Sequence, residues 1–293
     1  MRSGLGIRPI NGIPLDVRTA ALTSLAMVCF AANSLLCRLA LAPQRIDAAS
    51  FTTVRVLSAS AMLVAIFAVS RRSLPSVSAG NWRQTASLFA YLVFFSFAYT
   101  RLSAGTGALL LFGAVQLTMF IAALRHGERF PMLSWAGLGL AVLGLLYLLL
   151  PGATAPDPLG AVFMIIAGTA WGLLSLLARG GRDPLAANLA NFATCIPLVI
   201  AVSLALSGEF HVTAAGLSLA VASGAVASGL GYVIWYAALR GLARTHAATV
   251  QLAVPAIAAF GGVILLAEPV TTRLVVASCA LLGGVAVVIS RRA

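Results

Sequence analysis

The stretch "ATVQLAVPAIAAFGGVILLAEPV" (residues 248–270) joins a long apolar run to a proline and an acid. The run is long enough to cross a bilayer, since a membrane helix needs about 20 apolar residues. Pro255 lies in the middle of the run, and Glu268 closes it. Because proline removes a backbone hydrogen bond and clashes with the preceding turn, the stretch predicts a membrane helix that bends at Pro255.

The composition of the whole chain indicates a membrane protein. Of the 293 residues, 61% are hydrophobic and only 9% are charged, and the mean hydropathy is +1.02. A soluble domain has about a quarter of its residues charged. The net charge of +12 comes from arginines scattered in ones and twos between apolar runs. They form no basic stripe with interleaved aromatic residues, so we expect no nucleic-acid partner.

The cysteines give no sign of a disulfide or a metal site. All four lie inside apolar runs without CxxC spacing, at Cys29, Cys37, Cys195 and Cys279. Free cysteine packs as a small hydrophobic residue. We therefore expect no metal and no cofactor.

The order of apolar runs predicts an all-α membrane protein with ten transmembrane helices. The runs are residues 19–41, 48–69, 84–100, 104–124, 132–150, 158–178, 185–207, 214–239, 246–267 and 271–290. Residues 1–18 form a short polar tail before the first run, which is too long for the core of a signal peptide. The connections are short, so the sequence leaves no room for a separate soluble domain.

The arginines predict the orientation in the membrane. With the N-terminus in the cytoplasm, fourteen arginines lie on the cytoplasmic side, and only Arg45, Arg101 and Arg273 lie on the other. Cytoplasmic loops carry the excess of basic residues. We expect a multi-pass protein of the bacterial inner (plasma) membrane, with both termini in the cytoplasm.

The chain also divides into two similar halves of five runs, residues 19–150 and 157–290. A shift of 140 residues places Glu128 on Glu268 and Phe120 on Phe260, so each half has an acid after its fourth run. Because five is odd, the halves enter the membrane in opposite senses. Inverted repeats are typical of secondary transporters, which bind substrate between the halves. An old duplication kept for stability is the alternative.

Two segments resemble a known family. "RLSAGTGALLLFGAVQLTMFIAALRHGERF" (101–130) and "GYVIWYAALRGLARTHAATVQLAVPAIAAFGGVILLAEPVT" (231–271) are similar to the two EamA repeats of the drug/metabolite transporter superfamily. So are "FTTVRVLSASAM" (51–62) and "AWG" (170–172), and the resemblance covers residues 19 to 290. Within the family, "AGTGALLLFGAVQ" looks most like the YddG-type exporters of aromatic amino acids.

The resemblance implies two inverted five-helix halves around a central cavity, working by alternating access. Most members also carry a proline in the fourth span. Here Val115 and Gln116 occupy that place, opposite Pro255 and Ala256, so the two gates are expected to bend unequally.

Several polar or helix-bending residues fall inside apolar runs and are candidates for transport. Pro255 and Pro197 predict kinks, either facing the pathway or at static helix contacts. Polar side chains in membrane helices usually face the bundle interior. The candidates Gln116, Gln251 and Asn33 therefore either bind substrate or join helices by hydrogen bonds.

Arg55 and a set of aromatic residues are the remaining candidates. A charge at a helix centre costs roughly 2.5–3.5 kcal/mol on insertion scales, so Arg55 is expected to hold a substrate carboxylate or to clamp neighbouring helices. Mid-span rings suit a flat apolar substrate with a polar end, and interfacial belts are the alternative location. The candidate rings are Trp171, Tyr99, Tyr232 and Trp235.

The acids are predicted to act at helix ends. Glu128 and Glu268 lie there, as anchors or gate latches that pair with the nearby Arg129 or Arg273. No acid lies deep in a span, so the sequence predicts facilitated export and not carboxylate-coupled proton exchange.

The predicted function is therefore export of small metabolites, most of all amino acids and aromatic ones first, by a monomer. Other hydrophobic metabolites or drugs are the alternative substrates, with nucleotide sugars far behind. A channel or a non-transporting membrane partner is a weaker alternative. No GxSG, HExxH or P-loop motif occurs, so an enzyme is not expected.

Overall fold

The computed structural model describes residues 17–70, 81–178, 183–242, 247 and 249–290. The first repeat contains α1 (Val17–Leu41), α2 (Ala48–Val69), α3 (Trp82–Tyr99), α4 (Ala104–Arg125) and α5 (Met132–Leu149). The second contains α6 (Pro158–Leu177), α7 (Pro184–Ala205), α8 (Ala214–Val221), the π-helix η3 (Ala222–Leu230), α9 (Gly231–Leu239), α11 (Ala253–Leu266) and α12 (Thr272–Ser290). A short 3-10 helix, η2 (Ser207–Glu209), follows α7. The 1–18 tail lies outside the described residues except for Val17 and Arg18.

Within the described residues, eight helices are long and apolar enough to cross a membrane. One of them is the continuous rod Ala214–Leu239, formed by α8, η3 and α9. The predicted spans at 84–100 and 246–267 are the two that do not reach this standard. The helix α3 contains many polar and tyrosine side chains, and α11 has only 14 residues. The sequence prediction of an all-helical membrane protein is confirmed, and eight spans support it directly.

Short polar side chains begin six of these helices near the predicted positions. Each accepts a hydrogen bond from a backbone N–H two or three residues later, which satisfies a donor that the helix itself leaves unpaired. These residues are Asp47, Asn81, Ser103, Asp157, Asp183 and Thr213. The outer faces of the helices carry exposed apolar side chains, such as Leu143, Leu204 and Ile264, which is the surface expected against lipid.

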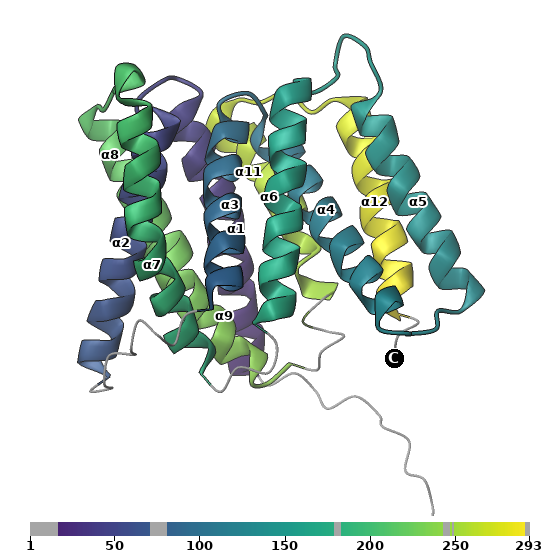
Figure 1. Ribbon diagram of the computed structural model, residues 1–293. Coiled ribbons are helices and arrows are strands. Elements are labelled where there is room, and N and C mark those ends of the chain that lie inside the picture. Colours follow the sequence, from purple (N-terminus) through teal and green to yellow (C-terminus); the bar gives the residue numbers. More distant parts are fainter. Residues whose placement is uncertain (1–16, 71–80, 179–182, 243–246, 248, 291–293) are drawn as a thin grey trace, which may run out of the picture.

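The helices of the two repeats pack in reciprocal pairs (Figure 1). Helix α1 packs against α9 and α11, and its counterpart α6 packs against α3 and α4. Helix α2 packs against α7, and α5 against α12. Glycines allow the close approaches: a Cβ at Gly137 would lie 2.6 Å from the Gly284 carbonyl oxygen, and one at Gly168 would lie 2.5 Å from that of Leu111. Gly172, one turn after Gly168, lies against Thr118 in the same way, so α6 and α4 approach closely.

The stretch around Pro255 is a broken helix. Residues 251 and 252 form a turn, and α11 begins at Ala253, which puts Pro255 in its first turn. Pro255 has no N–H for the carbonyl of Gln251, and that carbonyl accepts from the N–H of Val254 instead, at 3.1 Å. The helix start explains why the proline is tolerated there, since the first helical N–H groups have no intrahelical partner. The helix is therefore interrupted at residues 251 and 252, shortly before Pro255, where the sequence predicted a bend within one continuous helix.

Candidate functional site

A buried arginine lies at the centre of the bundle. Arg55 on α2 is 1% exposed, although it is one of the largest side chains in the protein. Its Nε donates to Ser228 Oγ at 3.3 Å, and its Nη2 donates to the Tyr91 hydroxyl at 3.1 Å. The guanidinium also lies over the ring of Phe95, with Cζ 4.9 Å from the ring centroid. Three helical elements (α2, α3 and η3) therefore hold the charge in place.

Asn33 extends this polar group into α1. Its Nδ2 donates to the Tyr91 hydroxyl at 3.4 Å, and its Oδ1 accepts from Ser223 Oγ at 2.6 Å. Asn33, Ser223 and Ser228 are all buried. The group of Asn33, Arg55, Tyr91, Ser223 and Ser228 is called the polar centre below. It joins α1, α2 and α3 of the first repeat to η3 of the second.

The π-helix η3 aligns the two serines. Its wider turn brings Ser223 and Ser228 closer together around the helix axis, whereas in an α-helix residues five apart point about 140° apart. Two glycines let η3 approach α2 closely. A Cβ at Gly224 would overlap the Arg55 carbonyl and Ser58 Oγ, and one at Gly229 would lie 3.0 Å from Met62 Cβ. The small residues of "SGAVASG" (223–229) thus bring the serines to Arg55.

Aromatic rings continue from the polar centre. The ring centroids of Tyr91 and Trp171 are 4.7 Å apart, and those of Trp171 and Tyr232 are 5.5 Å apart. Phe30 bridges Tyr232 and Trp235 at 5.8 and 5.9 Å. In the other direction, Phe95 lies 5.2 Å from Tyr91 and 4.8 Å from Tyr99. We call these rings the aromatic cluster: Phe30, Tyr91, Phe95, Tyr99, Trp171, Tyr232 and Trp235.

Six of the eight predicted substrate-binding residues meet in this region. Asn33 and Arg55 belong to the polar centre, and the other four belong to the aromatic cluster, namely Trp171, Tyr99, Tyr232 and Trp235. Tyr99, Tyr232 and Trp235 are buried, and Trp171 is half-buried. The cluster draws its rings from both repeats, on α1, α3, α6 and α9.

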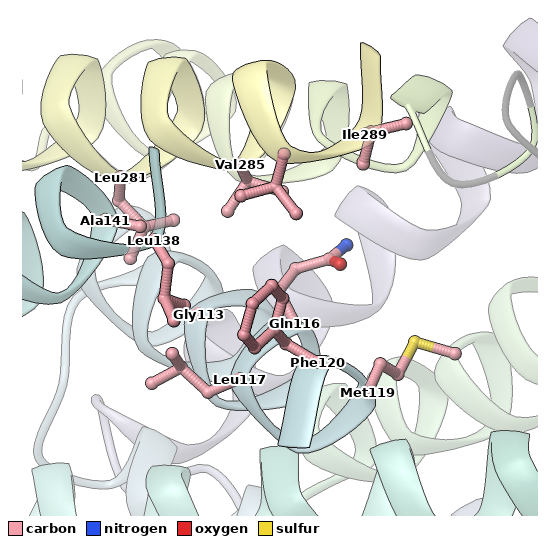
Figure 2. A pocket seen from close by; sticks show the side chains of 11 residues that line it. Gly113, Gln116, Leu117, Met119, Phe120, Leu138, Ala141, Leu281, Val285 and Ile289 are labelled. Atoms are coloured by element: carbon pink, nitrogen blue, oxygen red, sulfur yellow. The ribbon is translucent and has the colours of Figure 1, made fainter. Parts of the chain in front are cut away.

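The two glutamines lie elsewhere. Figure 2 shows Gln116 on α4 beside a narrow pocket that α5 and α12 complete, lined by apolar residues such as Phe120, Val285 and Ile289. The pocket holds about 30 Å³, which is room for little more than one water molecule. Gln251 is half-buried in the turn before α11. Neither glutamine is in the polar centre or the aromatic cluster.

Glu268 forms a contact between the repeats at one end of the bundle. Its Oε1 pairs with Arg38 Nε at 3.2 Å, and its Oε2 accepts from the backbone N–H of Ala104 at 2.9 Å. Arg38 Nη1 also donates to the Tyr99 carbonyl at 3.1 Å. Since Ala104 is the first residue of α4, the carboxylate meets the positive end of that helix. We call Arg38, Glu268 and the Ala104 N–H the latch.

The partner of Glu268 differs from the predicted Arg273. Arg273 donates instead to the carbonyl of Leu150 at the end of α5. Arg38 falls within the predicted first span, 19–41, and lies in the last turn of α1, beside the segment that follows α11. The prediction that Glu268 pairs with Arg273 was wrong. The chain turns at Ala267, which has a left-handed backbone conformation, and Glu268 then contacts α1 and α4.

The other two predicted gate residues lie on the surface. Pro197 is exposed within α7, so it faces away from the aromatic cluster. Glu128 is exposed in the connection after α4, and its backbone N–H donates to the Ala123 carbonyl at 3.1 Å.

Sequence reasoning missed Tyr91, Ser223, Ser228, Phe30 and the role of Arg38. One signal was available: "SGAVASG" repeats a Ser-Gly pair at an interval of five residues, which no α-helical face repeats. Tyr91 sits among the many aromatic residues of its run, and Phe30 is a lone phenylalanine in an apolar run, so neither carries such a signal.

These features define a multi-pass helical membrane protein with a buried site between two repeats. The family model described as the EamA-like transporter family matches residues 18–150 and again residues 158–290, and the chain belongs to this family. A protein of Pseudomonas aeruginosa, named "Uncharacterized protein PA1977", is 50% identical over 278 residues, which cover 94% of this chain and 96% of that protein.

The fold has also been seen in a solved structure. A crystal structure of a protein with 20% sequence identity superposes with a TM-score of 0.63, over 92% of this chain and 99% of the other. At this identity the likeness concerns the fold alone.

Proposed function

We propose that the protein is a secondary transporter that exports small metabolites across the bacterial inner membrane, aromatic amino acids first. In this mechanism the protein has ten membrane helices in two inverted halves. The halves expose the polar centre and the aromatic cluster to each side of the membrane in turn. The observation that carries it is that both repeats contribute to one buried group of rings around an arginine.

The helix pairing supports the inverted arrangement. Exchanging each helix with its counterpart in the other repeat turns the α1–α11 contact into the α6–α4 contact, and leaves the α2–α7 and α5–α12 contacts in place. Such reciprocity is expected when a two-fold axis relates the halves. In Figure 1, α1 begins and α12 ends at the same end of the bundle, which fits an even number of spans and termini on one side.

The latch supports a gate at the opposite end. Arg38, Glu268 and Ala104 lie at that end together with Arg101 and Asp157, which pair at 3.4 Å. By the arginine distribution this is the outer end. The latch ties α1 and α4 of the first repeat to the end of α11 in the second, so opening outward requires it to separate.

The aromatic cluster supports the substrate class. Rings 4.7 to 5.9 Å apart, tilted or edge-on to one another, offer faces on which a flat ring can pack once the helices part. The buried guanidinium, which lies over Tyr91 and Phe95 within the cluster, suits a substrate with a polar group at one end.

Transport by purified protein in lipid vesicles tests the proposal. Vesicles containing the protein should take up radiolabelled phenylalanine or tryptophan with saturable kinetics, and empty vesicles should not. A growth screen with toxic amino-acid analogues extends the test to cells, since an exporter should raise resistance. Absence of saturable uptake for aromatic and other amino acids alike would overturn the proposed function.

A further inference from the structure

The polar centre has an excess of hydrogen-bond donors. Arg55 Nη1 is buried and has no hydrogen-bond partner among the described residues. The Tyr91 oxygen accepts from both Arg55 Nη2 and Asn33 Nδ2, so its own O–H proton is left without an acceptor in the described structure. Arg55 and Tyr91, which are hydrogen-bonded to each other, therefore each have one donor without an acceptor: an N–H of Arg55 and the O–H of Tyr91.

The polar centre also carries an unbalanced positive charge. Among the described residues, Arg55 forms no ion pair, whereas Arg38 pairs with Glu268 and Arg101 pairs with Asp157 at the end of the bundle. A buried charge is costly unless it is paired and hydrogen-bonded. The neighbours of Arg55 are hydroxyl groups, an amide and aromatic rings, which leave its charge without a counter-ion.

The position of the charge within the aromatic cluster completes the site. Arg55 Cζ lies 4.9 Å from the Phe95 centroid and 5.4 Å from the Tyr91 centroid, and the ring of Tyr91 in turn contacts Trp171. An anion bound at Nη1 would thus lie beside a row of rings. A guanidinium and a hydroxyl that both donate match the two oxygens of a carboxylate.

We propose that Arg55 and Tyr91 bind the carboxylate of the substrate, and that the site therefore selects aromatic monocarboxylates. This inference rests on the proposed function and narrows it. Arg55 Nη1 donates to one carboxylate oxygen and the Tyr91 O–H donates to the other, while Ser228 and Asn33 hold the two donors in position. The ring of the substrate packs against Trp171 and Tyr232, and an α-amino group is dispensable because the polar centre contains no acid to receive it.

The proposal predicts a ranking among compounds that share one ring. Phenylalanine and 3-phenylpropanoate both carry the carboxylate and should bind. Phenethylamine and phenylalaninamide keep the ring and the amino group but lack the carboxylate, so they should bind more weakly by a factor on the order of 10 to 100, as expected for the loss of a charge-assisted hydrogen bond. Both of these compounds are also cations, which the unpaired arginine repels.

Binding to purified protein in detergent, followed by calorimetry and by tryptophan fluorescence, tests this ranking with all four compounds. The variant Tyr91→Phe keeps the ring and removes the O–H, and should weaken phenylalanine and 3-phenylpropanoate by about tenfold. Arg55→Lys keeps the charge but loses the planar pair of donors, and should weaken the same two compounds at least as much. The matched control is Tyr236→Phe, which also removes one hydroxyl group, from a ring that lies next to Tyr232 and takes no part in the polar centre. The affinity of this variant for phenylalanine and 3-phenylpropanoate should stay within about threefold of that of the wild type.

The outcomes separate the two proposals. If phenethylamine binds as tightly as 3-phenylpropanoate, or if Tyr91→Phe and Tyr236→Phe behave alike, the carboxylate site is wrong while export of aromatic compounds stands. If the ranking holds in the binding assay but vesicles show no uptake, the carboxylate site stands and the transport proposal fails. If none of the four compounds binds, the carboxylate site is overturned.

Discussion

Arg38 and Glu268 are separated by 230 residues in the sequence and form an ion pair with 3.2 Å between Nε and Oε1. The pair joins the last turn of α1 to Glu268, the second residue after α11, so it connects the two repeats at the end of the bundle. Glu268 also accepts the Ala104 N–H, and both side chains are mostly buried, at 22% and 14% exposed. Water therefore screens this pair less than a surface pair.

We expect Glu268→Gln to favour the state that is open at the outer end. The change removes the charge that meets both Arg38 and the first N–H of α4, and a hydrogen bond to a charged group is worth about 1.5–3 kcal/mol. The rate at which a thiol reagent labels a cysteine introduced at Leu102, in a background free of the native cysteines, should rise by about tenfold or more. Glu209→Gln, an exposed acid at the same end, is the control and should leave labelling unchanged.

The latch also predicts an asymmetric response to charge exchange. Arg38→Glu combined with Glu268→Arg restores opposite charges, but an arginine at 268 cannot accept the Ala104 N–H. The double variant should therefore recover only part of the closed population. Full recovery, measured by the same labelling, would show that the ion pair alone closes this end.

Trp171→Ala should weaken the transport of aromatic substrates. Trp171 connects Tyr91 of the first repeat to Tyr232 of the second, and an aromatic pair contributes about 0.5–1.5 kcal/mol beyond its buried area. Export of phenylalanine or tryptophan should fall by about three- to tenfold at equal protein abundance, and Trp235→Ala should act in the same direction. Trp135→Ala is the matched control, since Trp135 is 46% exposed on α5. Unchanged export in both cluster variants would remove these rings from the site.

Gly224→Ala should displace the polar centre without touching its side chains. The added Cβ would overlap the Arg55 carbonyl and Ser58 Oγ, and such overpacking costs typically about 1–3 kcal/mol. We expect a lower thermal unfolding temperature and weaker substrate binding together. Gly208→Ala provides the comparison, because a Cβ there meets nothing within 4 Å and should leave both measurements as they are.

Gln116→Leu should be close to neutral for transport. The pocket beside Gln116 is narrow and lined mainly by apolar side chains, and the residue lies on α4 apart from the polar centre. Uptake into vesicles should keep its Michaelis constant within about twofold of wild type. A marked loss of affinity would place the substrate between α4, α5 and α12 instead.

Uptake should not follow an imposed pH gradient when substrate is equal on both sides. No acid of the described residues takes part in the polar centre or the aromatic cluster, and Glu268 and Asp157 are engaged by arginines at the end of the bundle. The measurement is net accumulation in vesicles under a pH step. Accumulation that reverses with the sign of the step would indicate proton coupling and contradict the sequence interpretation.

The sequence predicted the helices well because their ends coincide with changes in polarity. The predicted run 48–69 matches α2, and the runs 104–124 and 158–178 differ from α4 and α6 by one residue. Capping residues such as Asp47 and Ser103 stand at those boundaries. The exception is the ninth run, where the turn at Gln251 and Leu252 has apolar residues on both sides. Hydropathy alone carries no information about that break.

The site was predicted in part, for a physical reason. Arg55, Trp171 and Asn33 could be chosen because charged, polar or bulky side chains are exceptional in the middle of an apolar run. Their partners could not be chosen, since Tyr91 is one of several rings in an aromatic-rich helix and Phe30 is an ordinary apolar residue of its helix. Ser223 and Ser228 come together only through π-helical bonding, which the hydrophobic pattern does not reveal. Contacts between repeats, such as Arg38 with Glu268, depend on tertiary packing.

The shortness of α11 has a consequence for how water enters the protein. Its 14 residues span about 21 Å, whereas the hydrocarbon core of a bilayer is about 30 Å thick. The turn at Gln251 and Leu252 must then lie below the headgroups, where unpaired backbone is tolerated only beside protein or a hydrated passage. We expect the half-buried Gln251 to stand at the cytoplasmic vestibule, so a solvent-exchange experiment on these amides would reveal the route by which solutes reach the interior from the cell.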